Sequence, residues 1–205
     1  VRIGAKQYLI FGAGYDSFGY RQPEWASNIQ IFELDRLALL QDKQRRLKSN
    51  QIAMPRNVYY LETDFAQKQW QKKIINHPAF DDAKNSFCSL LGLVYYLTKQ
   101  EFVNLLLAIS DFIPKGSSVV FDYPDEHSCT DAAGVRAKKQ VILASGAQEK
   151  MCAGYSYAKL EKMLSDVGFL IYEHLTPEQI TEQYFQNYNK ANPEACMTAF
   201  DHVNY

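Results

Sequence analysis

The sequence lacks the features that mark several large classes of protein. Its 22 basic and 23 acidic residues leave a formal net charge of -1, so it lacks the basic surface with which proteins bind nucleic acids. Its longest apolar runs fall short of the roughly 20 residues that span a bilayer, and no signal-peptide pattern opens it. We therefore expect neither a nucleic-acid partner nor a membrane anchor.

Clustered cysteines and histidines are also missing. The four cysteines include no C-x-x-C pair, and the four histidines are equally scattered. Zinc sites and disulfide frameworks depend on such clusters, so we expect neither, and no metal. Cysteines without such pairing are typical of a reducing compartment, which favours the cytoplasm.

What the 205 residues do show is an alternation of short apolar runs with segments of helical pattern. Strands are expected over residues 7–11, 30–34, 58–61, 87–91, 117–123, 169–175 and 197–205. Helices are expected over residues 16–20, 36–48 and 67–75, and from capping signals at Thr98, Ser156 and Thr176. The alternation predicts an α/β fold: one domain over residues 1–205 with a Rossmann-like, doubly wound, mostly parallel sheet.

One polar segment interrupts this alternation. Residues 125–154 contain alanines and lysines and include no strand pattern, although residues 130–145 look helical. Ligands of open parallel sheets bind at the carboxyl ends of the strands. We therefore interpret this segment as a helical lid over that edge.

A glycine turn follows the first expected strand, and acids end the second. In the turn formed by Gly12, Ala13 and Gly14, backbone amides can reach a ligand that any Cβ would push away. Glu33 and Asp35 lie about 20 residues later, a distance typical of an acid that binds ribose hydroxyls. We expect strand alternation to send one of the two inward, and Asp35 to be the ribose ligand.

The remaining residues at this edge indicate which cofactor is bound. Asp64 and Phe65 follow the third strand, where Asp64 would meet an adenine amino group. Ser17 stands where the dinucleotide fingerprint has its third glycine. A pyrophosphate needs the close helix approach that this glycine allows, whereas an amino-acid tail can use a polar residue such as Asp16. The pattern favours S-adenosylmethionine, with an NAD(P)-dependent oxidoreductase as the alternative.

Several motifs, taken in order, resemble one family. They are Gly12-Ala13-Gly14-Tyr15-Asp16-Ser17-Phe18-Gly19-Tyr20-Arg21, Phe32-Glu33-Leu34-Asp35, Gly92-Leu93-Val94-Tyr95-Tyr96-Leu97-Thr98 and Phe121-Asp122-Tyr123. Together they resemble the leucine carboxyl methyltransferase family of class I S-adenosylmethionine-dependent methyltransferases. The resemblance implies a seven-stranded sheet with an antiparallel last strand. It also implies methyl transfer to an oxygen, often a carboxylate, of a small metabolite or a protein, which leaves S-adenosylhomocysteine.

The resemblance assigns roles to individual residues. It implies cofactor contacts at Gly12, Gly14, Asp35, Asp64 and Phe65, and it places Tyr96 and Arg21 near the active site. Leu91 stands where the family commonly has a glutamate, so one cofactor or substrate contact is missing or replaced. The family also has an N-terminal helical segment ahead of the first strand. Its absence from these residues suggests an incomplete enzyme, or a truncated, non-catalytic protein.

The need for a catalytic base depends on the methyl acceptor. An ionised carboxylate attacks a sulfonium methyl group without help, whereas a hydroxyl needs a base within hydrogen-bond reach. The base candidates are His127 and Asp125, just past the fifth expected strand. His174 and His202 lie on expected strands, and we interpret both as structural.

Overall fold

The computed structural model describes residues 4–128 and 154–205. The chain divides into two compact units, each described here by itself. Unit 1 comprises Val1–Leu91 and Leu105–Val120, and unit 2 comprises Gly92–Asn104 and Phe121–Tyr205. The single domain expected over residues 1–205 stays a prediction. The helix expected over residues 130–145, and with it most of the expected lid, lies outside the described residues.

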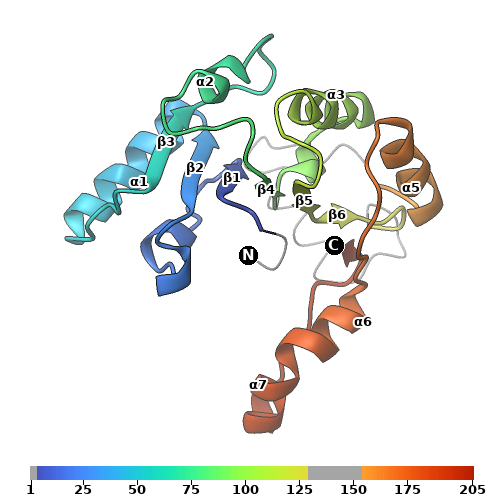
Figure 1. The fold of residues 1–205 in the computed structure, drawn as a ribbon. Coiled ribbons are helices and arrows are strands. Elements are labelled where there is room, and N and C mark those ends of the chain that lie inside the picture. Colours follow the sequence, from blue (N-terminus) through green and yellow to red (C-terminus); the bar gives the residue numbers. More distant parts are fainter. Residues whose placement is uncertain (1–3, 129–153) are drawn as a thin grey trace. The chain divides into compact units, whose positions relative to one another are not determined.

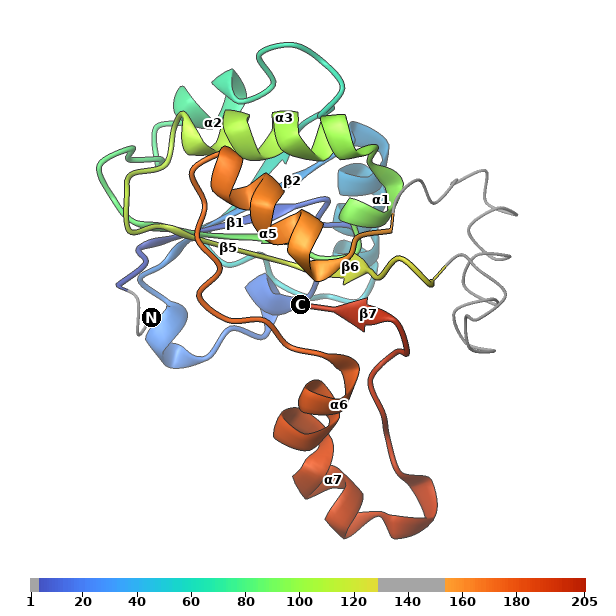
Figure 2. The same ribbon diagram turned by 90° about the vertical axis from the view of Figure 1, so that its right-hand side faces the viewer.

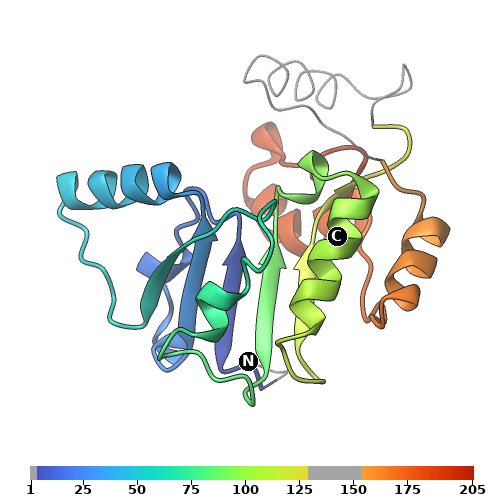
Figure 3. The ribbon, with the colours of Figure 1, turned by 90° about the horizontal axis from the view of Figure 1, so that it is seen from above.

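Unit 1 is built on a five-stranded sheet in the order β3-β2-β1-β4-β5. Figure 3 shows these strands side by side. β1 pairs in parallel with β2 and with β4, and β2 pairs in parallel with β3. The strands are β1 (Gln7–Phe11), β2 (Gln30–Asp35), β3 (Val58–Glu62), β4 (Ser86–Leu90) and β5 (Ser118–Phe121). The strand order reverses direction between β1 and β4, the position at which ligands of such sheets bind.

The central strands are buried along nearly their whole length. Leu9, Phe11, Ile31 and Phe32 expose none of their surface, as expected for strands covered on both faces. Trp70, before α2 (Lys72–Ile75), and Phe112, after α3 (Lys99–Ser110), extend this core. Trp70 packs edge-on against the rings of Phe11 and Phe112. The apolar runs expected to form the first, second and fourth strands therefore contribute to the core.

Two 3₁₀ turns and the helices α1 and α2 connect β1 to β4, and α3 follows β4. The long helix is α1 (Leu37–Ser49), labelled in Figure 1. Two single 3₁₀ turns, Phe18–Tyr20 and Glu24–Ala26, stand between β1 and β2. The helix expected over residues 67–75 is only α2 (Lys72–Ile75), because Gln69 has a left-handed φ of 64° that interrupts the helical backbone. α3 (Lys99–Ser110) follows its expected capping box, in which Thr98 and Glu101 exchange hydrogen bonds.

Unit 2 contains a small sheet of its own. β6 (Tyr123–Pro124) pairs antiparallel with β7 (Val203–Asn204), as Figure 2 shows. The last strand is thus antiparallel, but it is much shorter than the one expected over residues 197–205. The expectation of one seven-stranded sheet was wrong, since the described residues form a five-stranded and a two-stranded sheet.

The strand expected over residues 169–175 is also absent from the described structure. Leu170 and Tyr172 expose 90% and 98% of their surface, so the apolar residues of this run lack the burial that stabilises a strand. At its end, Leu175 and Tyr205 exchange two backbone hydrogen bonds of 2.8 and 3.0 Å.

Helices supply the rest of unit 2. A 3₁₀ turn, η3 (Val94–Tyr96), precedes α3, and α5 (Tyr157–Asp166) follows Ser156 as expected. A helical arm then runs through α6 (Pro177–Ile180), the π-helical turn η4 (Thr181–Phe185), α7 (Gln186–Ala191) and the 3₁₀ turn η5 (Pro193–Ala195). Figure 2 shows this arm leading back to β7. Among the described residues, none of the helices combines the length and apolar character needed to cross a bilayer.

The start of this arm offers a stability test. Thr176 and Gln179 form the expected capping box, in which the Thr176 hydroxyl accepts the Gln179 N–H. Thr176→Ala removes that acceptor, and we expect a loss of about 1 kcal/mol, local to the arm. Amide hydrogen exchange should accelerate at Gln179 and Ile180. Thr176→Ser, which keeps the hydroxyl acceptor, is the matched control, and equal acceleration in both variants would contradict the assignment.

Candidate cofactor site

The glycine turn at the end of β1 is hydrogen-bonded to β2, and it leaves space beside Gly14. The amides of Gly12 and Ala13 both donate to the Leu34 carbonyl, at 2.9 and 3.2 Å. Gly12 and Gly14 have φ angles of +65° and +46°, a region that favours glycine. A Cβ added to Gly14 would meet only the Gly12 oxygen, at 3.9 Å. A Cβ at Gly14 would therefore meet no side chain of the described residues within 4 Å.

Asp35 lies against this turn, as the sequence predicts. Its Oδ2 accepts the Gly14 N–H at 2.7 Å, and its Oδ1 accepts the Arg36 N–H at 2.7 Å. The residue is 7% exposed. A carboxylate offers about four acceptor positions, so these two bonds leave capacity for the hydroxyls of a ribose. Asp35 thus joins the ends of β1 and β2 at the edge where a nucleoside is expected.

The other acids predicted at this edge each stabilise their own turn. Asp64 accepts the Ala66 N–H at 3.1 Å and the Gln67 side-chain amide at 3.2 Å. Asp16 accepts the Phe18 N–H at 2.7 Å. Both are half-buried. Their contacts with a cofactor stay a prediction.

Phe65 is half-buried beside the core of unit 1. Its ring centroid lies 5.7 Å from that of Phe11 and 5.2 Å from that of Trp70. These contacts hold the ring directly after Asp64, next to the end of β3. A ring fixed in this way is suited to pack against a purine, which is the role that the family resemblance implies.

Glu33 differs from Asp35 in burial. Residues two apart share a face of a strand, so the expectation that alternation separates them was wrong. The Glu33 side chain is fully enclosed, and its Oε2 accepts a hydrogen bond from Lys43 Nζ at 2.6 Å. Burial raises the pKa of Glu33, although the Lys43 ammonium opposes that shift. This enclosure favours a structural role and leaves Asp35 as the acid available to a ligand.

Two further predicted residues of unit 1 are exposed. The Arg21 Nε donates to the Ser17 hydroxyl at 2.9 Å, so Arg21 stays close to the loop that follows the glycine turn. Leu91, directly after β4, exposes 45% of its surface. Its side chain offers apolar surface where the family commonly has a carboxylate, so side-chain contacts there are limited to van der Waals packing.

Unit 2 repeats the pairing of a glycine amide with an aspartate. Gly92 has a φ of +68°, and its N–H donates to Asp122 Oδ1 at 2.6 Å. The Tyr95 hydroxyl donates to Asp122 Oδ2 at 3.3 Å. Burial raises the pKa of Asp122, although both of these bonds favour its ionised form. Asp122 thereby fixes the turn that leads into the 3₁₀ helix carrying Tyr96.

The two catalytic candidates of unit 2 are both accessible. Tyr96 exposes 38% of its surface. His127 is exposed, and its backbone N–H donates to Asp125 Oδ1 at 2.8 Å. The structure therefore brings the backbone N–H of His127 to the Asp125 carboxylate. The catalytic roles of Tyr96, His127 and Arg21 stay predictions.

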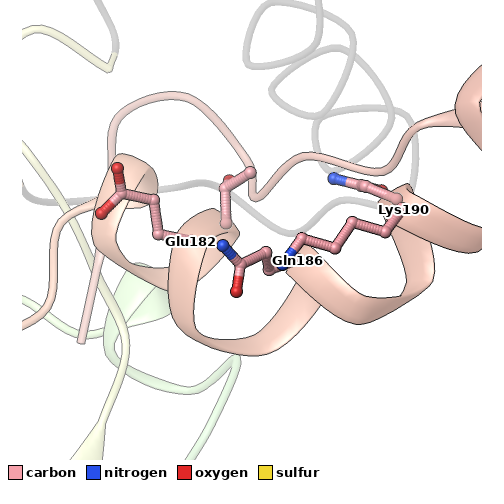
Figure 4. Close-up of a pocket in the computed structure, with 5 residues that line it drawn as sticks. Glu182, Gln186 and Lys190 are labelled. Carbon is pink, nitrogen blue, oxygen red and sulfur yellow. The ribbon is translucent and has the colours of Figure 1, made fainter.

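A polar hollow of about 370 Å³ lies on the helical arm of unit 2. It is lined by Thr181, Glu182, Gln186, Asn189 and Lys190. Figure 4 shows Glu182, Gln186 and Lys190 along this stretch of helix. None of the predicted site residues lines it. Among residues 4–128 and 154–205, no group of three or more metal-binding side chains occurs.

Sequence reasoning missed the roles of Lys43 and Asp122. Lys43 lies three residues after Leu40 and four before Leu47, so helical periodicity places it on the apolar face of α1. A cation on that face, together with an acid inside the apolar strand β2, is a signal for a buried ion pair. Asp122 could have been found as an acid at the end of a strand, as Asp35 was.

Comparison with known proteins identifies the family. The sequence profile described as "Leucine carboxyl methyltransferase" matches residues 1–110. YktD of Bacillus subtilis (strain 168), named as a candidate S-adenosyl-L-methionine-dependent methyltransferase, is 38% identical over 208 residues, covering 99% of this chain and 65% of that protein. Rv0281 of Mycobacterium tuberculosis (strain H37Rv), named in the same way, is 32% identical over 151 residues, covering 71% of this chain and 47% of that protein.

The fold is similar to that of solved methyltransferase structures. The crystal structure of a candidate methyltransferase from Thermobifida fusca YX matches with a TM-score of 0.60 and 15% identity, covering 85% of this chain and 63% of that one. The chain thus spans about 65% of the length of YktD and about half of Rv0281. The match of the family profile to more than half of the residues places this chain in the leucine carboxyl methyltransferase family.

Proposed function

We propose that this chain carries the cofactor site of an S-adenosylmethionine-dependent O-methyltransferase, whose acceptor is an oxygen of a small metabolite or of a protein C-terminus. The observation that carries the proposal is the 2.7 Å hydrogen bond from the Gly14 amide to the Asp35 carboxylate. It joins an open glycine turn to an acid at the ends of adjacent parallel strands, the arrangement that recognises an adenosine with a polar tail.

The residues of unit 1 fit this cofactor in a defined way. The turn formed by Gly12, Ala13 and Gly14 would let the amino-acid arm approach the backbone closely, with Asp16 nearby in sequence. Asp35 would bind the ribose hydroxyls, and Asp64 with Phe65 would contact the adenine. When bound, S-adenosylmethionine supplies a methyl group activated by its positive sulfur. The protein then needs only to align an oxygen with that methyl group and to exclude water.

Methyl transfer is favoured over hydride transfer. Ser17, in place of the third glycine of the dinucleotide fingerprint, is exposed and bonded to Arg21, so it offers no close helix approach for a pyrophosphate. The names of YktD and Rv0281 also support methyl transfer. Oxygen as the acceptor atom rests on the family resemblance.

Calorimetry tests this proposal directly. We expect S-adenosylhomocysteine to bind the chain with one-to-one stoichiometry, and NADH to show no binding at the same concentration. Binding of NADH in preference to S-adenosylhomocysteine, or of neither, would overturn the proposal. Transfer of labelled methyl groups from S-adenosylmethionine then separates an enzyme from a protein that only binds the cofactor.

A further inference from the structure

The two most exposed large apolar side chains of the described residues belong to one short segment of unit 2. Leu170 and Tyr172 expose 90% and 98% of their surface, whereas the next, Tyr184, exposes 64%. Single apolar side chains at a surface are common and need no explanation. Here two of them stand two residues apart in the run 169–175, which has the composition of a strand and forms none.

Residues 169–175 are held at both ends and are unpaired in between. The Phe169 N–H donates to the Leu164 carbonyl at 2.9 Å, and Leu175 exchanges two backbone hydrogen bonds with Tyr205. Between these contacts, the backbone groups of residues 170–174 form no hydrogen bond with any other described residue. Unpaired backbone N–H and C=O groups in a row are a template on which a further strand can pair.

One edge of this segment is free. Backbone groups of successive residues in a strand face opposite edges, and those of Leu175 face Tyr205. By this alternation the backbone groups of Leu170 and Tyr172 face the other edge, away from Tyr205. Their side chains share one face of the segment, while Ile171 on the other face is half-buried. The free edge therefore carries two apolar side chains on its solvent side.

We propose that a second copy of this chain pairs with this edge, antiparallel and about a two-fold axis at Ile171. In this register each Leu170 lies opposite the partner's Tyr172. Each such pair exchanges two backbone hydrogen bonds, so the two symmetry-related pairs supply about four. The inference goes beyond the proposed function and does not depend on it, because it involves residues of unit 2 alone.

The register follows from the two apolar side chains. An axis between two residues would set the exposed face of one copy against the half-buried face of the other. With the axis at Leu170, Tyr172 lies opposite the partner's Gly168, and with the axis at Tyr172, Leu170 lies opposite the partner's His174. The axis at Ile171 gives both side chains an apolar neighbour, and an aromatic residue across from an aliphatic one is a favourable cross-strand pair.

Charge permits this pairing of like with like. The chain carries a formal net charge of -1, so two copies repel each other little. The one acid of the segment, Glu173, lies opposite the partner's Phe169 in this register, so like charges do not meet. A foreign chain would be selected through a complementary charge pattern, and residues 169–172 carry no charge. A second copy is therefore the occupant that fits this edge.

The pairing is expected to be weak. The backbone bends at Tyr172, and straightening it costs conformational entropy when the two copies meet. Two strands of this length also bury less area than the roughly 1,200 Å² of stable interfaces. We therefore expect a dimer with a dissociation constant of about 10–100 µM, which forms at high concentration and dissociates in dilute solution.

Sedimentation equilibrium between about 5 and 500 µM tests the inference, because this range spans the expected constant. We expect the wild-type chain to change from monomer to dimer. The double variant Leu170→Lys with Tyr172→Lys places like charges opposite each other, and it should weaken association more than about tenfold. The matched control is Leu39→Lys with Leu107→Lys, which changes two exposed apolar side chains of unit 1. It should stay within about threefold of wild type.

An exchange of charge tests the register itself. The double variant Leu170→Glu with Tyr172→Glu should also be monomeric by itself. An equimolar mixture of the lysine and glutamate variants should form a heterodimer, because each introduced lysine then lies opposite an introduced glutamate. Salt at about 1 M should dissociate this heterodimer by screening its charges. Both positions are almost fully exposed, so circular dichroism should show a folded protein in every variant.

Three results would overturn the inference. A wild-type chain that stays monomeric up to about 500 µM would leave this edge to a strand of another protein. A lysine double variant that dimerises like wild type would assign the dimer to a different surface. Charge variants that do not associate when mixed would exclude the register centred on Ile171. Binding of S-adenosylhomocysteine bears on none of these results, so failure of the proposed function is recognised separately.

Discussion

Replacing Asp35 with asparagine is expected to weaken S-adenosylhomocysteine binding by about 100-fold. A hydrogen bond to a charged group contributes about 1.5–3 kcal/mol, and the proposed site forms two such bonds to the ribose. The amide nitrogen of asparagine donates rather than accepts, so one ribose bond is lost and the other loses its charge. About 3 kcal/mol is lost in total, and each 1.4 kcal/mol corresponds to a factor of ten.

The change should also affect the glycine turn. Asp35 accepts the amides of Gly14 and Arg36 with separate oxygens, and asparagine can satisfy only one of them. Because the second amide is then left without this partner, we expect a modest decrease in stability beside the large decrease in affinity. Calorimetry measures the affinity, and urea denaturation measures the stability.

Asp42→Asn is the matched control for this experiment. Asp42 lies on α1 and bonds to Tyr15 and to Arg46 at 2.6 Å each. The hydrogen bonds from Tyr15, Arg45 and Arg46 lower its pKa, so it is ionised at neutral pH like a ribose-binding acid. It lies on the surface of α1 and belongs to none of the predicted contacts. Equal affinity losses in both variants would remove Asp35 from the site.

The parts of the fold that could be predicted are those specified by local pattern. The runs ending at Phe11 and Asp35 are apolar, short and followed by turn residues, and both form central strands. The capping boxes at Thr98 and Thr176 formed as expected because their hydrogen bonds join residues three apart. The glycine turn and Asp35 were predictable because each marks the end of a strand with a distinctive residue type.

The parts that could not be predicted depend on contacts between distant segments. Whether residues 169–175 form a strand depends on a neighbouring strand to pair with, and Tyr172 remains almost fully exposed. The Asp125–His202 pair depends on the pairing of β6 with β7. Sequence spacing contains no information about that register. The sequence could name His127 and Asp125 as candidate bases, but it could not name the side chain that pairs with Asp125.

The second large effect concerns stability. Lys43→Met is expected to lower the free energy of unfolding by about 3–5 kcal/mol near neutral pH, because it leaves the enclosed carboxylate of Glu33 without its counter-ion. Both side chains are nearly inaccessible to water, at 4% and 0% exposure. The double variant Lys43→Met with Glu33→Leu should recover most of this loss, since an apolar pair avoids the desolvation of charge. Urea denaturation measures both.

The loss should depend on pH in a definite direction. Burial raises the pKa of Glu33 even in the presence of Lys43, and removing the ammonium raises it further. The folded state then binds a proton more tightly than the unfolded state, so stability decreases as pH rises from the unfolded pKa of about 4.5 through the raised folded pKa. The deficit of Lys43→Met relative to wild type should be smallest near pH 4.5 and larger at pH 7.5.

Lys48→Met separates this mechanism from a general effect of losing a lysine on α1. Lys48 is exposed and lies in the last turn of the same helix, where a cation contributes only about 0.3–1 kcal/mol. A deficit of Lys43→Met that stays constant from pH 4.5 to 7.5, or that matches the deficit of Lys48→Met, would mean that Glu33 is not an enclosed charge. In that case Glu33, like Asp35, would again be a candidate for binding the ribose.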